Sequence, residues 1–291
     1  LGTGSIAAFA GLYMWEGRCP QPLLPIDMIR NPALAVLFVL AMLVGFIIFA
    51  LMFYAPLLLQ GGFGLSPQAA GLLITPMAAC ITVGSILNGR IISHIDKPNR
   101  MLYAGFGTLT AACLGIVTTH HDTPHVLFGF YMFLAGVGIG FTMPNLTIFA
   151  QHSADRTLLG IATATLQSTR MVGGMLGTAI VGTIVSHSYL WRVTDVLRSE
   201  NALQWLPQLR NPQVLVDPEA QQTLAAQLSQ HGSQASELLE HVREALVAGI
   251  HNGQVLAVLV ALTGLWLVRR VPVIQLVRPD RRKAPPKEDA P

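Results

Sequence analysis

The sequence predicts an all-α fold, a bundle of helices that crosses a membrane several times. Of the 291 residues, 52% are hydrophobic and only 11% are charged, whereas soluble domains carry about 25% charged residues. The charges are also segregated, because residues 33–59 and 245–268 contain no Asp, Glu, Lys or Arg. Each of these runs is long enough to cross a bilayer as a helix, which takes roughly 20 apolar residues.

One partial span and six complete spans follow in chain order. Residues 1–32 read as the end of a truncated span and a cytoplasmic connector, whose four prolines exclude a continuous helix. Because the chain starts with leucine in an apolar stretch, we expect it to be the C-terminal fragment of a longer protein. Five spans fall within residues 33–186 and the sixth within 245–270: 33–59, 68–92, 101–119, 126–149, 158–186 and 245–268.

A long polar region separates the last two spans. Residues 187–244 should form an extracytoplasmic loop with helices, since Asp217, Pro218 and Glu219 together favour a helix start. The apolar residues after Ser236 fall on one helical stripe, so a second helix should run directly into the last span. Residues 271–291 are rich in proline and basic side chains, which is typical of a disordered tail.

Lysine and arginine set the expected orientation in the membrane. They occur in the connector before residue 33, in the loop at 93–100, just before residue 158 and in the tail, whereas the turns at 60–67 and 120–125 have none. This alternation places the basic segments and the C-terminus in the cytoplasm. The net charge of +3 arises from the tail, so nucleic acid is not an expected partner.

Two of the spans are rich in glycine. Gly136 and Gly140 are spaced as GxxxG in one span, and Gly173 and Gly177 in the next. Small residues at this spacing let membrane helices pack closely, so we predict that all four lie in helix contacts. A cofactor-binding loop is not indicated, because no strand precedes these glycines.

Few polar side chains lie inside the spans, and these are the candidate substrate contacts. A charge as deep as Arg170 normally faces a partner or a water-filled path. Arg170 either faces a central cavity and binds an anionic group or a carboxylate of the missing half, or pairs with Gln167, Asn145 or helix-end carbonyls. Asn145, near a helix end, either lines the cavity or lies at the interface. Tyr54 either lines it or belongs to the aromatic belt at the membrane surface.

Neither catalysis nor a metal centre is indicated. No Asp or Glu lies inside the six spans, and no nucleophile–base arrangement is present. His120, His121 and His125 occur on one turn, but a zinc site needs a further ligand in fixed geometry. We therefore expect solvated histidines, no metal and no enzymatic activity.

Three stretches carry motifs. The loop from Gly89 and Arg90 to Arg100 begins with glycine and continues through Asp96 and basic residues. The other two are Tyr54-x-Pro56-x-x-Leu59-Gln60 with Gly64-Leu65-Ser66-Pro67-x-x-Ala70-Gly71, and Arg170-x-x-Gly173-Gly174-x-x-Gly177.

These motifs resemble the major facilitator superfamily, and most closely the C-terminal half of its fourteen-span drug:proton antiporter branch. The likeness covers about residues 1–270. The loop looks like the degenerate second copy of the conformational-switch loop of that family, with Gly89 as its first residue and Arg90, Asp96 and Arg100 as its charged residues. It departs from the family at Ser93, where the family has its acid.

The resemblance implies proton-coupled efflux of amphipathic or cationic small molecules by alternating access across a bacterial inner membrane. The energy source would be the proton gradient, with no cofactor. Since the spans hold no acid, the titrating carboxylate would belong to the missing N-terminal half. Expected partners are that half, the lipid bilayer and the small-molecule substrate.

Two other functions stay open. One is a narrow-specificity exporter of a metabolite or antibiotic. The other is a non-transporting membrane scaffold, in which the region 187–244 docks an extracytoplasmic partner such as a periplasmic adaptor. Region 187–244 is long for a simple connector, which is the feature that keeps the scaffold in consideration.

Overall fold

The computed structural model describes residue 28 and residues 30–272, apart from 93, 96, 121–122, 201, 218–219 and 221–234. Within these residues every element is helical, and six helices are long and apolar enough to cross a membrane. The predicted all-α polytopic bundle is confirmed. The expected truncated span and connector before residue 28, the helix start at Pro218 and Glu219, and the tail after residue 272 lie outside the described residues.

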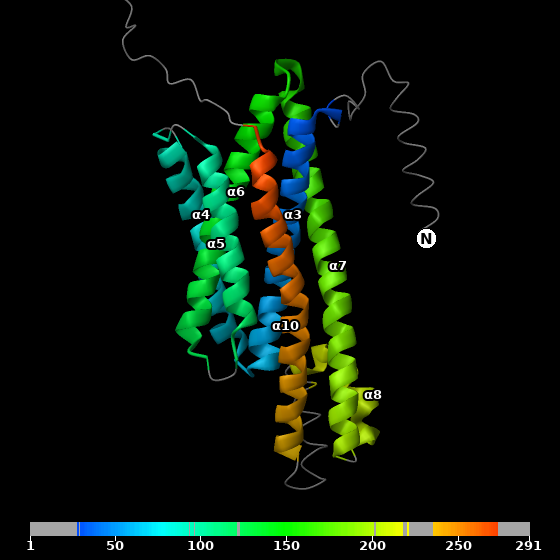
Figure 1. Ribbon diagram of the computed structural model, residues 1–291. Helices are drawn as coiled ribbons and strands as arrows, with labels where there is room; N and C mark the ends of the chain where they lie inside the picture. Colours follow the sequence, from blue (N-terminus) through cyan, green and yellow to red (C-terminus); the bar gives the residue numbers. More distant parts are fainter. Residues whose placement is uncertain are drawn as a thin grey trace, which may run out of the picture.

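The six long helices run side by side in a bundle (Figure 1). Their bounds are α3, Pro32–Pro56; α4, Pro67–Ile92; α5, Asn99–Val117; α6, His125–Ser153; α7, Leu159–Ser199; and α10, Ala235–Leu267. Short helical segments join or extend them: η1, Leu57–Gly62; η2, Arg156–Leu158; η3, Leu203–Trp205; α8, Leu206–Leu209; η4, Pro212–Leu215; and η5, Val268–Arg270.

The helices form two layers. Helices α4, α6, α3 and α7 form a row in which each packs on the next, and α5 and α10 pack together behind it. Helix α3 is the most enclosed, with 61% of its most apolar stretch buried, against 17% for α4 and 28% for α7 at the two ends of the row. The row therefore has exposed helices at its edges and a buried one inside.

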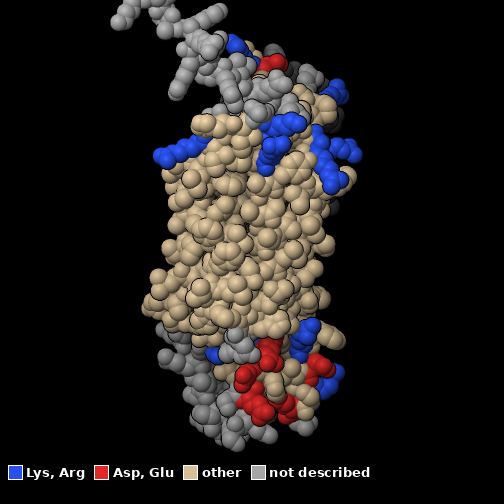
Figure 2. Space-filling view, turned by 60° about the vertical axis from the view of Figure 1, so that its left-hand side comes forward, with Lys and Arg blue, Asp and Glu red and all other residues tan. Residues whose placement is uncertain are grey.

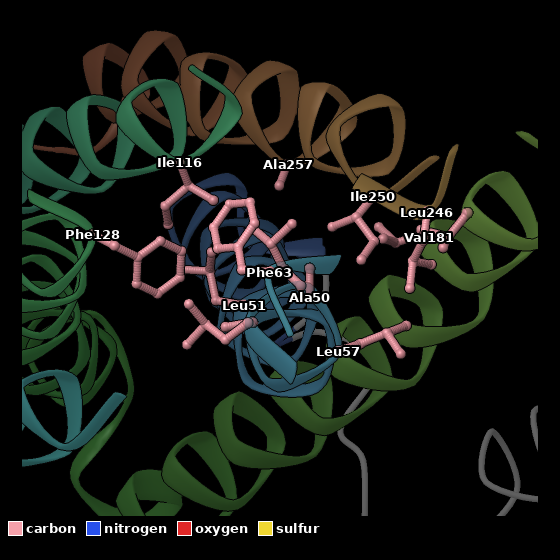
Figure 3. Packing of buried hydrophobic residues seen from close by; sticks show 14 of the residues in the cluster. Ala50, Leu51, Leu57, Phe63, Ile116, Phe128, Val181, Leu246, Ile250 and Ala257 are labelled. Atoms are coloured by element: carbon pink, nitrogen blue, oxygen red, sulfur yellow. The ribbon is translucent and has the colours of Figure 1, made fainter. Parts of the chain in front are cut away.

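The core surrounds α3. Figure 3 shows Ala50 and Leu51 of α3 among side chains that other helices supply. Ile116 comes from α5, Phe128 from α6, and Val181, Ile250 and Ala257 from α7 and α10. Other helices pack around much of α3, and its remaining face carries exposed apolar residues such as Met52 and Phe53. Its sequence is therefore a continuous hydrophobic run rather than an amphipathic one.

Residues near the two ends of α3 explain why the helix begins and ends there. The Asn31 side chain accepts a hydrogen bond from the Ala33 backbone N–H at 3.0 Å, and Pro32 occupies the first turn, where its missing donor costs nothing. At the other end Pro56 leads into the wide π-helical turn η1. Gly61 and Gly62 of that turn pack against Leu246 and Val247 of α10, and a Cβ at either glycine would overlap them.

Glycines bring two helix pairs into backbone contact. On α7, a Cβ at Gly173 would collide with the Met42 carbonyl of α3, and one at Gly177 would lie 2.5 Å from the Phe46 carbonyl oxygen. On α6, Gly136 lies against the Met77 backbone of α4, and a Cβ at Gly140 would lie 2.7 Å from the Ile81 carbonyl oxygen. All four GxxxG glycines thus lie where two backbones meet.

Helix α7 extends beyond the boundary expected from hydropathy, because it continues past Ser186 to Ser199. Helix α10 begins at Ala235, which confirms the predicted helix after Ser236 that runs directly into the last span. The two project together at one end of the bundle, where α8 packs beside α7 (Figure 1). The buried Tyr189 hydroxyl donates a hydrogen bond to the Leu209 carbonyl at 2.7 Å, and His241 Nδ1 lies 2.6 Å from a Glu200 carboxylate oxygen.

The charges lie at the two ends of the molecule. On the face in Figure 2, Lys and Arg occupy one end, Asp and Glu dominate the other, and the band between them has no charged side chain. The ends of the helices carry these charges: Arg90 lies in the last turn of α4, Arg100 in the first turn of α5 and Arg270 in η5, whereas Glu237 lies in the first turn of α10. An uncharged band between two charged ends is the surface that a bilayer requires.

We predict that Gly173→Ala lowers stability, because its Cβ would meet the Met42 carbonyl and force α3 and α7 apart. Overpacking of this kind costs about 1–3 kcal/mol. Thermal unfolding of the purified chain in detergent measures the effect. Gly160→Ala is the matched control on the same helix, because no atom lies within 4 Å of a Cβ there. Equal melting temperatures for the two variants would contradict the packing role.

Candidate functional site

Arg170 lies within the apolar part of α7 and is half-buried. Its neighbours Gln167 and Ser168 are exposed, and so are Met171, the next residue, and Met175, five residues further along. Its guanidinium makes no hydrogen bond or ion pair with any other described residue. The pairings with Gln167 and Asn145 that the sequence left open are therefore not present in the described part of the chain.

Most hydroxyl groups in the same helices are satisfied internally. Thr163, Thr169 and Thr178 of α7 each donate to the carbonyl four residues earlier, at 2.7–3.1 Å. Thr142 and Thr147 of α6 do the same. Back-bonding of this kind removes a polar group from contact with lipid. Arg170 stands apart, since it carries five donors and no partner among the described residues.

Asn145 lies in a helix interface. It is completely buried between α6 and α4, and its Nδ2 donates to Asn88 Oδ1 at 2.7 Å and to the Phe141 carbonyl at 2.6 Å. Asn88 Nδ2 and Asn145 Oδ1 are buried without a partner among the described residues. Ser85 adds a longer contact of 3.4 Å to the Gly140 carbonyl across the same interface. In this conformation Asn145 joins two helices and does not reach an open surface.

Tyr54 joins α3 to α7. Its hydroxyl donates to the Thr178 carbonyl at 3.0 Å, and the side chain is half-buried. Gly182, one turn beyond Thr178, leaves room for the hydroxyl, because a Cβ there would overlap it. Tyr54 therefore lies on the same helix pair as Arg170, further toward the acidic end.

The two edge helices of the row expose small, polar and methionine side chains. On α4 these include Thr75, Ala78 and Thr82, and on α7 they include Gln167 and Met175. Small and flexible side chains adapt to ligands of different shape. On α7 these side chains lie on the same helix as the unpaired cation of Arg170, so that helix exposes both flexible apolar and polar groups.

The conformational-switch loop is described in part. Gly89 and Arg90 lie near the end of α4 and are exposed. Arg100 lies in the first turn of α5 and is also exposed. Asp96 lies outside the described residues, so its place in the conformational-switch loop stays a prediction.

Two other features were not found from the sequence. His251 of α10 lies near His120, with ring centroids 6.1 Å apart, although no group of three metal-binding side chains occurs among the described residues. Gly45 of α3 faces the Arg170 carbonyl so closely that a Cβ would collide with it. Gly45 is a lone glycine in an apolar run, so no motif marks it in the sequence. The one available signal was that the helix with Gly173 and Gly177 needs a partner helix that can approach closely.

The sequence matches the family description Major Facilitator Superfamily over residues 16–178. It is 29% identical to the tetracenomycin C resistance and export protein of Streptomyces glaucescens, over 99% of this chain and 51% of that protein. It is 26% identical to the multidrug transporter protein MdtP of Bacillus subtilis, over 74% of this chain and 42% of that protein. It is also 26% identical to the tetracycline resistance determinant of Streptomyces rimosus, over 75% of this chain and 61% of that protein. The chain spans about half the length of these curated relatives.

We predict that Asn88 and Asn145 are energetically coupled. Replacing either one by alanine leaves the other buried amide without its partner, which costs about 1–3 kcal/mol. The double variant should cost less than the sum of the two single variants, because no orphaned amide remains. A double-mutant cycle from denaturant unfolding measures the coupling. Strict additivity would show that the 2.7 Å contact does not stabilise the protein.

Proposed function

The chain belongs to the major facilitator superfamily, and from that premise we propose that it is one half of an efflux transporter for amphipathic small molecules. The family consists of multi-pass membrane transporters rather than enzymes, which agrees with the six apolar helices. The observation that carries the proposal is the match to an export protein along nearly the whole chain.

The geometry supports a transport path along the row of α4, α6, α3 and α7. This row has one side that is not covered by α5 and α10, which pack behind it. We propose that it forms one wall of an alternating-access path, in which two helical halves rock about a central site. Since the chain spans about half of its relatives, the second wall would come from the other half of the protein, in a fourteen-span arrangement with this chain as the C-terminal half.

Proton coupling is part of the same proposal. Coupling needs a membrane-embedded group that changes its charge, and carboxylates are the usual choice. The six spans contain no Asp or Glu, so the carboxylate would lie in the other half. We further propose that the basic end of the molecule faces the cytoplasm of a bacterium and that the acidic end lies outside the inner membrane, which the positive-inside rule supports.

A narrow-specificity antibiotic exporter is the second candidate. Relatives carry names that refer to tetracenomycin C and methylenomycin A resistance. Within this half, the only charge deep in the spans is the cation of Arg170, with no acid to balance it. A lone cation repels cationic drugs and attracts anionic or oxygen-rich ligands, which favours such a substrate over a cationic one at this wall.

We predict that Arg170→Gln lowers export at least tenfold when the complete reading frame that contains these residues is expressed. A lost charge-assisted hydrogen bond to substrate is worth about 1.5–3 kcal/mol, and 1.4 kcal/mol is a factor of ten. The export rate is measured as the loss of an amphipathic compound from preloaded cells, with equal amounts of each variant in the membrane. Arg192→Gln is the control, because it makes the same change on the exposed extension of α7. Equal export by both variants would remove Arg170 from the site.

Sequencing the DNA upstream of Leu1 tests the half-transporter proposal separately. We expect roughly 200 further residues or more, with about eight spans of roughly 20 apolar residues each and a buried acid among them. A start codon just upstream would overturn the proposed mechanism.

A further inference from the structure

We propose that the basic end of the bundle holds a binding site for an anionic phospholipid, at the place where α5 begins and α10 ends. Its headgroup phosphate would bind the guanidinium groups of Arg100, Arg269 and Arg270. Its acyl chain would lie along the exposed face of α10.

A buried hydrogen bond brings the two segments together. The side-chain Nδ2 of Asn99, at the start of α5, donates to the Val271 carbonyl at 3.0 Å and to the Pro272 carbonyl at 3.3 Å. Asn99 is 8% exposed, so this contact is shielded from water. Arg100 and Arg270 are the immediate chain neighbours of the bonded residues. This contact brings the backbones of two basic residues from distant parts of the sequence to one junction.

Apolar contacts fix the end of α10 beneath these cations. Val268 and Val271 are 1% and 4% exposed and belong to one core cluster with Leu102 of α5. The two residues between these valines, Arg269 and Arg270, are exposed. Burial on either side holds this turn in place, so both arginines point outward at a defined position.

Trp266 sets the depth of the site. Its indole is 54% exposed, and the Arg270 guanidinium carbon lies 5.6 Å from the ring centroid. Tryptophan favours the headgroup level of a bilayer, and a cation over its face is held by the ring. Arg270 is thus placed where lipid phosphates lie, and the planar guanidinium can bind two oxygens of one phosphate.

The exposed face of α10 favours a lipid over a soluble anion. Below Trp266, large apolar side chains recur at the spacing of one helical face and are 44–54% exposed: Val255, Leu259 and Leu262. This stripe leads directly to Arg270. A free phosphate would use the cations alone, whereas a phospholipid uses both the cations and the stripe.

The surrounding charge also favours an anion. Lys97 is exposed beside the same junction. Among the acids of the described residues only Asp155 lies at this end, next to Arg156 in the connection between α6 and α7. Each basic residue near the surface of an anionic membrane strengthens attraction about fivefold.

The test is lipid binding by the purified 291-residue chain in detergent, titrated with phosphatidylglycerol and read by native mass spectrometry. Arg270→Gln should weaken binding about fivefold, and Arg270→Lys, which keeps the charge but loses the bidentate geometry of the guanidinium, should restore only part of it. Arg156→Gln removes the same charge at the same end, but from the connection between α6 and α7, and should change binding less than twofold. Phosphatidylcholine should bind all variants alike, and thermal unfolding with that lipid checks that each is folded.

Three results would overturn the proposal. Equal losses for Arg270→Gln and Arg156→Gln would mean that the whole basic surface attracts lipid without a site. Inorganic phosphate that displaces phosphatidylglycerol at equal concentration would indicate a soluble anion site. Unchanged phosphatidylglycerol binding by Arg270→Gln would exclude a lipid site at this junction. If Arg270→Gln fails to fold, Arg269→Gln tests the same site.

Discussion

The architecture depends on direct contact between helix backbones at two places in the row. Gly45, Gly173 and Gly177 let α3 and α7 touch, and Gly136 and Gly140 do the same for α6 and α4. Inside a bilayer the hydrophobic effect gives little drive for helix association, so close packing and hydrogen bonds between helices must supply it. The interhelical bonds of Tyr54 and of the Asn88–Asn145 pair lie on these same two helix pairs.

The membrane also explains which polar groups stand out. Threonine hydroxyls along the spans return to their own helix backbone, which hides them from lipid. A side chain that cannot be hidden in this way needs a function, a partner or water. Arg170 is such a side chain, and its position beside the glycine contacts between α3 and α7 means that a ligand bound there would act on that pair of helices. This links the proposed substrate contact to the proposed rocking motion.

Both ends of the molecule are built from segments that are far apart in sequence. At the acidic end, the extensions of α7 and α10 pack with α8 and are joined through Tyr189 and the His241–Glu200 contact. At the basic end, Asn99 attaches the end of α10 to α5. The two ends differ in charge and in construction, and each is held by a small number of polar contacts over an apolar base.

The sequence by itself determined the number of spans, the all-α class and the segregation of charge, because a bilayer imposes length and polarity on each segment independently of its neighbours. It also predicted that the GxxxG glycines contact other helices, and it singled out Arg170. It did not determine where α7 ends, since a helix can leave the membrane without a break and hydropathy marks only the apolar part. Nor could it predict that Asn145 contacts Asn88, that Gly45 contacts Arg170, or that Asn99 contacts Val271. Those pairings depend on which helices are neighbours and on their relative rotation, and only the packed bundle decides both.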